Sequence, residues 1–413
     1  MDGGQTFPFG FKVSASGEAD IRWLSEKFEK QVISARVRDF DKMGGMSGDF
    51  YLLDVTVADD AEADGEKKAR RQASLALKIT GRQSGKLETA KALGTAREGI
   101  FYAELARHLT EAGVPQAWYA NGDLATGEKL VLMECLPDAV PCGIFFGPSQ
   151  PNNWELKDRI AEMSKGNPNM KEITAHAFSL YAKMHARYWK DPTILQHHWL
   201  RGADWMQGKG GNQWLDAQKM AADAWLEQKE LMQKEEAKIR WDAHVVACLD
   251  KSFALVSWDD FQAHLAATSW TLVHGDCHAH NALWIKQRTE DATMALIDFE
   301  MVGIGSPAQE LGQYLISHMP PDVRRASEHD LVRGYHAELS AKLKARGESV
   351  EAESFDFDSC WSEYVTGGAG RWLWFVPYLA KVCPPEMGQF FHDQLSAFLH
   401  DHVEVEQIRM PRA

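Results

Sequence analysis

The chain has few cysteines and no long hydrophobic run. It contains six cysteines in 413 residues, and no two of them form a CxxC pair. Scattered cysteines in a chain of this length are typical of a reduced, intracellular protein. The strongest apolar stretch, residues 372–380, is far shorter than the roughly 20 residues that span a bilayer. The N-terminus has no basic segment followed by an apolar one, so we predict a cytoplasmic protein without a signal peptide or membrane segment.

Basic residues do not outnumber acidic ones in this chain. The formal net charge is −14, which argues against a nucleic-acid partner, because such proteins present a basic face. Glycine and proline occur at ordinary levels, which excludes a collagen-like or mostly disordered chain. The length corresponds to two or three domains and suffices to bury a core without disulfides. We expect a globular protein that handles small molecules, and the oligomeric state stays open.

The apolar pattern changes near residue 135. Before it, helical spacing alternates with β-forming runs, at residues 19–32 (helix), 34–39, 50–57 and 74–79 (strands), 96–112 (helix) and 130–133 (strand). Beyond it, helices are expected at 171–188, 332–343 and 389–402, with short strand-like runs at 271–273 and 295–299. The turn-prone segment 135–141 separates the two patterns. We predict an α+β fold with a small antiparallel-sheet lobe over 1–135 and a large, mainly helical lobe over 136–413.

Two carboxylate-bearing turns in the second part carry the strongest functional signal. Residues 273–281 spell VHGDCHAHN and residues 295–300 spell ALIDFE. Asn281 follows Asp276 by five residues, and Asp298 follows Asn281 by 17. This spacing matches the catalytic loop H-R-D-x-x-x-x-N and the metal-binding D-F-G of kinases. Mg²⁺ prefers oxygen ligands, so Asn281 and Asp298 are the predicted metal ligands.

The residues around Asp276 form the predicted catalytic group. Asp276 would orient a substrate hydroxyl and accept its proton. We expect His274 to brace the loop by hydrogen bonding, and His278 is a candidate contact of the transferring phosphoryl group. A zinc site that uses Cys277, His278 and His280 is the alternative, although the sequence shows no obvious fourth ligand.

A lone cation lies upstream in an apolar strand-like run. Lys78 is flanked by Leu77 and Ile79, and a buried charge without a partner is costly. A phosphate and a carboxylate would satisfy it. Glu98 is the preferred carboxylate, because the rival Glu104 lies six residues later on a different helix face. An exposed strand lysine is the alternative.

A Gly-rich turn precedes the second β-forming run. Residues 43–49 spell MGGMSGD, and Gly45, Ser47 and Gly48 are candidates to approach phosphates closely. The segment is not a Walker A motif, because no G-K-[ST] follows it. An ordinary hairpin turn is the alternative.

The motifs together resemble the aminoglycoside phosphotransferase and choline kinase superfamily, and most closely its ecdysteroid-kinase-like members. HGDxHxxN at residues 274–281 is that superfamily's hallmark. Residues 184–189 (MHARYW) are similar to its L-H-A-x-x-W helix end, and residues 305–312 (GSPAQELG) to its G-x-P-x-x-D-L-A segment. The resemblance spans about residues 35–320. Glu300 and Glu310 depart from the family's usual Gly and Asp, and neither departure removes a catalytic group; Glu310 is expected to brace the catalytic loop.

The resemblance implies a protein-kinase-like, two-lobed fold and transfer of a phosphoryl group from ATP, with Mg²⁺, to a hydroxyl of a small molecule. Glu134 and Leu136 would then offer backbone groups to adenine. Only 12 residues separate Asp298 from Glu310 and no A-P-E follows, so no activation loop is available to bind a peptide substrate. A non-catalytic nucleotide-binding pseudokinase and a nucleotidyl transferase are the alternatives.

The acceptor is less well defined by the sequence. Seven of the tryptophans in the predicted helical lobe would line an aromatic pocket or simply pack helices together, at positions 199, 205, 214, 225, 361, 372 and 374. The acidic charge favours a cationic acceptor, and the tryptophans favour an apolar or aromatic alcohol. The segment GGAGR at 367–371 indicates a close backbone approach or a hinge.

Overall fold

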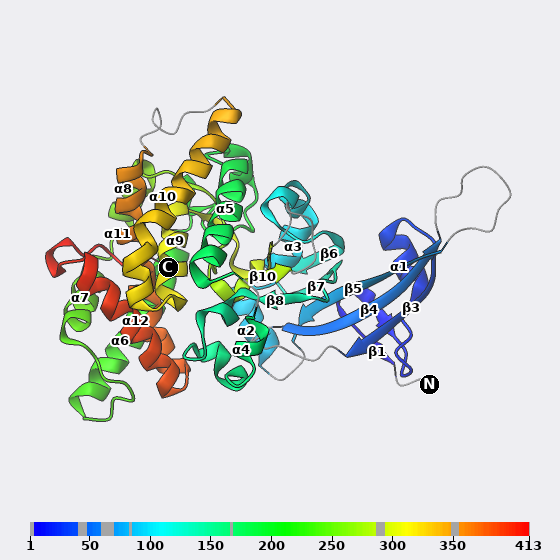
Figure 1. Cartoon of the computed structure of the whole chain (residues 1–413), viewed down its shortest axis with the longest axis horizontal. Helices are drawn as coiled ribbons and strands as arrows, with labels where there is room; N and C mark the ends of the chain where they lie inside the picture. Colours follow the sequence, from blue (N-terminus) through cyan, green and yellow to red (C-terminus); the bar gives the residue numbers. More distant parts are fainter. Residues whose placement is uncertain are drawn as a thin grey trace. The chain divides into compact units, whose positions relative to one another are not determined.

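The chain forms two compact units (Figure 1). A computed structural model describes residues 4–39, 48–58, 70–81, 85–165, 168–285, 294–347 and 355–412. Unit 1 comprises Met1–Ala139 and Ile285–Val302, and unit 2 comprises Val140–Trp284 and Gly303–Ala413. The predicted C-lobe was continuous from residue 136, whereas here residues 285–302 join unit 1. Phe299 explains this assignment, because its ring stacks on Phe101 at 4.2 Å between centroids.

Unit 1 is built on a five-stranded antiparallel sheet. Its order is β3-β4-β5-β7-β6. The strands are β3 (Val32–Asp39), β4 (Gly48–Ala58), β5 (Arg70–Thr80), β6 (Ala117–Asp123) and β7 (Glu128–Glu134). Leu75, Leu77 and Ile79 alternate along β5 and are buried, as their spacing predicts. The N-terminal strands β1 (Gln5–Thr6) and β2 (Lys12–Val13) form a separate pair.

Three helices accompany this sheet, and two end earlier than predicted. Helix α1 covers Ile21–Phe28 rather than 19–32, because the Asp20 side chain caps its start and Glu29 adopts a left-handed conformation (φ 53°) at its end. Helix α3 covers Arg97–Glu104 rather than 96–112, and 3₁₀ turns continue the chain from there. Helix α2 (Lys86–Leu93) was not predicted. Leu24 and Phe28 of α1 join the apolar core of the sheet.

Unit 2 is mainly helical. Its helices are α4 (Ile160–Met163), α5 (Met170–Arg187), α6 (Gly211–Gln233), α7 (Ala243–Ala254), α8 (Trp258–Ala267), α9 (Pro307–His318), α10 (Pro321–Ala345), α11 (Phe357–Val382) and α12 (Pro385–His402). The helix expected at 171–188 is α5, and those expected at 332–343 and 389–402 are parts of α10 and α12. The GGAGR segment lies inside α11, a helix that was not predicted. The antiparallel sheet unit and the helical unit confirm the predicted α+β, protein-kinase-like, two-lobed class.

Short strands frame the two carboxylate-bearing turns. In unit 2, β9 (Thr271–Val273) pairs antiparallel with β12 (Gly303–Gly305). The remaining short strands are β8 (Ala139–Pro141), β10 (Ala282–Ile285) and β11 (Met294–Leu296). Asp276 and Asn281 lie between β9 and β10, and Asp298 follows β11 directly. The strand predicted to reach Phe299 therefore ends at Leu296.

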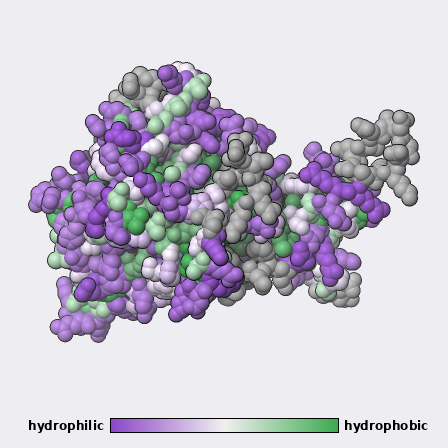
Figure 2. All heavy atoms as spheres, in the orientation of Figure 1, coloured by the Kyte–Doolittle hydropathy of each residue, from purple (hydrophilic) through white to green (hydrophobic). Residues whose placement is uncertain are grey.

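Most of the tryptophans proposed for an aromatic pocket pack the interior. Trp214, Trp225, Trp372 and Trp374 are buried, whereas positions 199, 205 and 361 are half-buried. The face in Figure 2 is mostly hydrophilic, with apolar residues scattered among polar ones. None of the helices in the described ranges is long and apolar enough to cross a membrane.

Helix α3 depends on two glycines for its place beside β6. A Cβ at Gly99 would lie 2.1 Å from the Asn121 carbonyl oxygen, and a Cβ at Gly122 would lie 2.0 Å from that of Ala96. These oxygens belong to the backbone, so a side chain at either position would force the helix away from the strand.

We expect Gly99→Ala to lower the free energy of unfolding by about 1–3 kcal/mol, because the helix must move away from the strand. Gly334→Ala in α10 is the matched control, since a Cβ there would meet nothing within 4 Å. Alanine at that position should stabilise the protein by up to about 1 kcal/mol. Denaturant unfolding measures both, and a Gly99→Ala variant as stable as the wild type would contradict the close packing.

Candidate functional site

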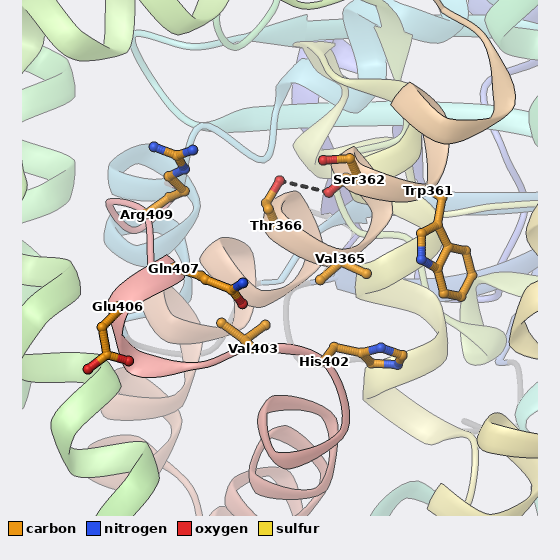
Figure 3. A pocket seen from close by; sticks show the side chains of 9 residues that line it. All are labelled: Trp361, Ser362, Val365, Thr366, His402, Val403, Glu406, Gln407 and Arg409. Atoms are coloured by element: carbon orange, nitrogen blue, oxygen red, sulfur yellow. Dashed lines mark hydrogen bonds between the residues drawn. The ribbon is translucent and has the colours of Figure 1, made fainter.

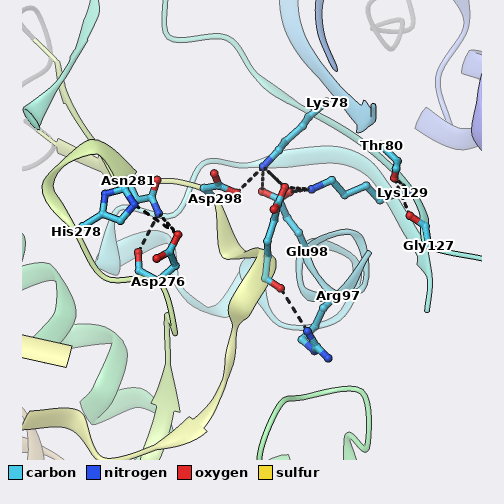
Figure 4. A network of polar contacts seen from close by, with 11 residues as sticks. Lys78, Thr80, Arg97, Glu98, Gly127, Lys129, Asp276, His278, Asn281 and Asp298 are labelled. Carbon is cyan, nitrogen blue, oxygen red and sulfur yellow. Dashed lines mark hydrogen bonds and ion pairs between the residues drawn. The ribbon is translucent and has the colours of Figure 1, made fainter. Parts of the chain in front are cut away.

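Lys78 binds two carboxylates inside unit 1 (Figure 4). Its Nζ lies 2.7 Å from Glu98 Oε2 and 2.7 Å from Asp298 Oδ1. The Lys78 side chain is 3% exposed and that of Glu98 is fully buried. Strand β5 supplies the lysine, the first turn of α3 supplies Glu98, and the turn after β11 supplies Asp298. Of the two predicted partners, the structure places Glu98 on the lysine.

A second buried lysine, which the sequence analysis missed, joins the same network. Lys129 of β7 is fully buried, and its Nζ lies 2.6 Å from Glu98 Oε2 and also contacts Glu300 Oε1. Glu300 in turn lies 3.3 Å from the Lys78 ammonium. The signal was present, because Lys129 is a cation at the start of an apolar run, as Lys78 is within one. Its partner Glu300 is far away in sequence, so the pair was not recognised.

The three carboxylates keep the buried Lys78 side chain charged. Burial alone would lower the pKa of Lys78, but Asp298, Glu98 and Glu300 outweigh it and hold that pKa well above its ordinary value. Two ammonium groups thus face three carboxylates, which leaves a net negative charge. The ligand oxygens of Glu98, Asp298 and Glu300 lie within 4.8 Å of one another. The lysines occupy the oxygens of Glu98 and Glu300, so Asp298, at 34% exposure, is the member that can offer a carboxylate oxygen to Mg²⁺.

The Asp276 loop forms a second group of polar contacts, within unit 2 (Figure 4). The Asn281 amide nitrogen donates to the Asp276 carbonyl at 2.9 Å and to its carboxylate at 3.2 Å. Because both bonds use the amide nitrogen, the amide oxygen is the atom that Asn281 would offer a cation. His278 Nε2 lies 3.5 Å from Asp276 Oδ2. The backbone N–H of Asp276 donates to His274 Nδ1 at 3.3 Å, which fits the bracing role that stays a prediction for His274.

Glu310 of α9 holds the start of this loop. Its carboxylate accepts the backbone N–H groups of His274 at 2.9 Å and Gly275 at 2.6 Å, and it contacts His185 at 3.1 Å. Burial tends to raise the pKa of Glu310, but His185, His274 and Gly275 outweigh it and lower that pKa. The carboxylate is therefore ionised and aligned with two backbone donors, so glutamate can serve where the resembled family usually has aspartate.

The charge state of Asp276 follows from its neighbours. Burial acts to raise its pKa, but His278, His274 and Arg371 outweigh that effect and lower it to about 2. Asp276 is consequently a carboxylate at neutral pH, with an oxygen able to accept a hydrogen bond from a hydroxyl.

Three histidine rings lie next to one another in this unit. The His318 ring centroid is 5.4 Å from that of His278 and 5.1 Å from that of His280. Burial lowers the pKa of His280 to about 3 and that of His318 well below its ordinary value, so both stay neutral. Within the described ranges, the acidic trio of unit 1 is the only set of three potential metal ligands that converges. The zinc alternative with Cys277, His278 and His280 therefore has no support.

The predicted nucleotide-contacting residues are only partly described. Gly45 and Ser47 lie outside the described residues. Gly48 begins β4, and a Cβ there would lie 3.4 Å from Lys78 Cε, so this glycine borders the lysine stem. Glu134 ends β7 and accepts the Gln116 backbone N–H at 3.2 Å, and Leu136 follows two residues later. Their contact with adenine stays a prediction.

A separate hollow of about 620 Å³ lies beside α11 (Figure 3). Of the residues considered from the sequence, its lining contains only Trp361, one of the tryptophans suggested for an acceptor pocket. The lining consists of Trp361, Ser362, Val365, Thr366, His402, Val403, Glu406, Gln407 and Arg409.

Comparison with known proteins supports the superfamily resemblance. Residues 167–348 match the ecdysteroid kinase-like family. This range contains both carboxylate-bearing turns, and the match confirms the resemblance inferred from them. No curated protein sequence matches the chain.

The comparison with solved structures finds small-molecule kinases and phosphotransferases of low sequence identity. Choline kinase from Cryptosporidium parvum is 9% identical, with 89% of this chain and 88% of that chain covered and a TM-score of 0.46. Choline kinase from Streptococcus pneumoniae is 13% identical, with coverages of 92% and 98% and a TM-score of 0.43. The GDP complex of aminoglycoside 2'-phosphotransferase-IIIa is 12% identical, with coverages of 92% and 95% and a TM-score of 0.46.

Lys129→Met should destabilise unit 1 strongly, by about 3–5 kcal/mol, because it removes one of two buried ammonium groups and leaves three carboxylates facing Lys78 alone. The double variant Lys129→Met/Glu300→Gln should recover part of this loss, since it also removes a negative charge. Urea unfolding measures both variants. Lys381→Met is the control, because its pair with Glu227 is 46% exposed on both sides and should contribute little to stability. Equal losses in the two single variants would contradict the network.

The buried His318 predicts a loss of stability in mild acid. Its pKa is lower in the folded protein than the ordinary 6.5, so the unfolded chain binds more protons once the pH falls below that value. Stability is thus retained above about pH 6.5 and falls by about 1.4 kcal/mol per pH unit below it. We expect His318→Gln to shrink the wild-type difference in unfolding free energy between pH 7 and pH 5 by about 2 kcal/mol. An unchanged difference would show that the pKa of His318 is not lowered in the folded protein.

Proposed function

We propose that this chain, whose residues 167–348 match the ecdysteroid kinase-like family, is a kinase that transfers the terminal phosphoryl group of ATP to a hydroxyl of a small molecule, with Mg²⁺. The carrying observation is the contact of Lys78 with Glu98 and Asp298. These three residues were selected from sequence for nucleotide and metal binding, and they meet at one ammonium group although 220 positions separate Lys78 from Asp298.

The residues of unit 1 supply the nucleotide-binding half of the proposal. Lys78, held by Glu98, offers a charged ammonium to the phosphates of ATP. Asp298 offers a carboxylate to Mg²⁺, and Asn281 of unit 2 would offer an amide oxygen to it. The metal, when bound, neutralises charge on the phosphates. Glu300 and Lys129 balance the charge behind Lys78 and keep Glu98 in place.

The residues of unit 2 supply the chemistry. Asp276 accepts the proton of the acceptor hydroxyl, the hydroxyl oxygen forms a bond to the terminal phosphorus, and the bond between that phosphorus and the bridging oxygen of ADP breaks. His278, beside the Asp276 carboxylate, is the proposed contact of the transferring group. His274 and Glu310 hold the loop, so the barrier is lowered by positioning and charge neutralisation.

The short connection after Asp298 supports a small acceptor. Residues 299–301 form one 3₁₀ turn, β12 follows at Gly303–Gly305, and α9 begins at Pro307. No segment long enough to serve as a platform for a peptide lies between them. The acceptor class stays an apolar or aromatic alcohol, or an amino alcohol or aminoglycoside. Burial of Trp214, Trp225, Trp372 and Trp374 removes much of the support for an aromatic pocket built from tryptophans.

The test is ADP release from Mg-ATP with choline, ethanolamine, kanamycin, an ecdysteroid and benzyl alcohol as acceptors. Asp276→Ala should lower kcat by at least about 100-fold and leave the Kd for Mg-ATP nearly unchanged, because Asp276 acts on the acceptor side. Lys78→Met should instead weaken nucleotide binding. Retained turnover in Asp276→Ala would refute its assignment as the base.

Product mass separates the two enzymatic alternatives. Phosphoryl transfer adds about 80 Da to the acceptor and nucleotidyl transfer adds about 329 Da. A pseudokinase would bind Mg-ATP and modify none of the acceptors, and a chain that fails to bind Mg-ATP would refute the roles of Lys78, Asn281 and Asp298 together.

A further inference from the structure

The Gly-rich segment of α11 allows an unusually close crossing with α9. A Cβ on Gly368 would lie 2.8 Å from the Gly312 Cα, and one on Gly312 would lie 2.5 Å from the Gly368 Cα. Neither helix can carry a side chain at this point without moving apart, because the obstructing atoms are backbone. Helix α9 carries Glu310 just before the crossing, and α11 carries Arg371 just after it. The crossing therefore fixes an acidic and a basic side chain relative to each other.

Arg371 makes three hydrogen bonds and two ring contacts while 2% exposed. Its guanidinium donates to the Gly275 carbonyl at 3.2 Å, to Gln313 Oε1 at 3.4 Å and to the Arg412 carbonyl at 3.4 Å. The rings of Phe375 and Trp374 flank it at 4.3 and 5.5 Å. Burial lowers its pKa only to about 10, so it is charged at neutral pH. Three acceptors in different directions require a guanidinium, which has five N–H donors in a fixed plane.

The Gly275 backbone is held on both sides. Its N–H donates to Glu310 at 2.6 Å, and its carbonyl accepts from Arg371 at 3.2 Å. Gly275 has a left-handed conformation (φ 82°), which glycine adopts without the steric cost of a Cβ. The carbonyl belongs to the same peptide plane as the N–H of Asp276. A rotation of that plane would turn the Asp276 side chain as well.

We propose that Arg371 is a positioning residue that fixes the peptide plane between Gly275 and Asp276, next to the two planes that Glu310 holds, and thereby the direction of the Asp276 carboxylate. Its catalytic meaning rests on the proposed function. Arg371 touches neither nucleotide nor acceptor in this proposal, and it acts through the loop. This proposal gives the GGAGR segment a role. Its glycines permit the close crossing of α9 and α11, and its arginine reaches the Gly275 carbonyl from there.

The chain offers a matched control in Arg324 of α10. This arginine is 1% exposed, lies in a helix of the same unit, and binds Glu328 at 2.8 Å and also Asp401. Its guanidinium lies over the Phe398 ring at 5.1 Å. None of the contacts recorded for it involves the Asp276 loop. Replacing either arginine removes a buried guanidinium from unit 2. Arg324 pairs with carboxylates and Arg371 with carbonyl and amide oxygens, and of the two only Arg371 bonds Gly275.

The experiment compares Arg371→Met and the milder Arg371→Lys with Arg324→Met and Arg324→Lys in the full chain. For the first acceptor phosphorylated in the panel above, Arg371→Met should lower kcat per folded molecule about 10–100-fold, while the KM for Mg-ATP changes less than about 3-fold. Arg371→Lys should fall between this variant and the wild type. Both Arg324 variants should keep the wild-type kcat per folded molecule, whatever their Tm.

Hydrogen exchange of the peptide over residues 271–281 gives a readout that needs no acceptor. Exchange should be faster in Arg371→Met than in Arg324→Met, because only the former loses the bond to the Gly275 carbonyl. Equal exchange in these two variants, or equal kcat where turnover is measurable, would overturn the positioning role. A wild type that phosphorylates nothing would refute the proposed function instead, and the exchange comparison would then decide the loop contact by itself.

Discussion

Two buried ammonium groups make the carboxylates of unit 1 possible. Glu98, Asp298 and Glu300 come from a helix and from a turn after β11, and Lys78 and Lys129 come from adjacent strands β5 and β7. Carboxylates so close together would repel one another, and those that are buried would take up protons, if the lysines were absent. The position of α3 against the sheet, the glycines at its contact with β6, and the stacking of Phe299 on Phe101 all serve to bring these charges together.

In unit 2, buried charged side chains hold the backbone of a loop. The Asp276 loop contains few apolar side chains that would hold it by packing, so its backbone groups are held by charged side chains from α9 and α11. Charge-assisted hydrogen bonds to backbone are stronger and more directional than neutral ones. A loop held in this way keeps its shape although it has no regular secondary structure of its own between β9 and the turn at Ala279–Asn281.

Features that depend on the spacing of residues within short segments could be predicted from the sequence. The order of Lys78, Glu98, Asp276, Asn281 and Asp298 gave the α+β, two-lobed class, which the structure confirms, and the helix-face argument favoured Glu98 over Glu104. The buried ion pair of Lys129 was not predicted, because its partner Glu300 is distant in sequence. Helix α11 was not predicted, because the glycines at 367, 368 and 370 lower helix propensity. These glycines are explained by the close contact between Gly368 and Gly312 of α9, which only the structure shows. Helix α1 was drawn too long because the periodic apolar residues continue into β3, whose Val32 belongs to the sheet core.

The ion pair between Lys78 and Asp298 has a thermodynamic consequence. In the structure the Lys78 ammonium lies 2.7 Å from the Asp298 carboxylate, so a ligand that binds either group must weaken this ion pair. A phosphate that draws the ammonium away leaves the carboxylate more attractive to a cation, and a cation on the carboxylate leaves the ammonium more attractive to a phosphate. Each ligand then strengthens the binding of the other by the same factor, since such coupling is reciprocal. Under the proposed function, nucleotide and metal would therefore bind this chain cooperatively, even before they touch each other.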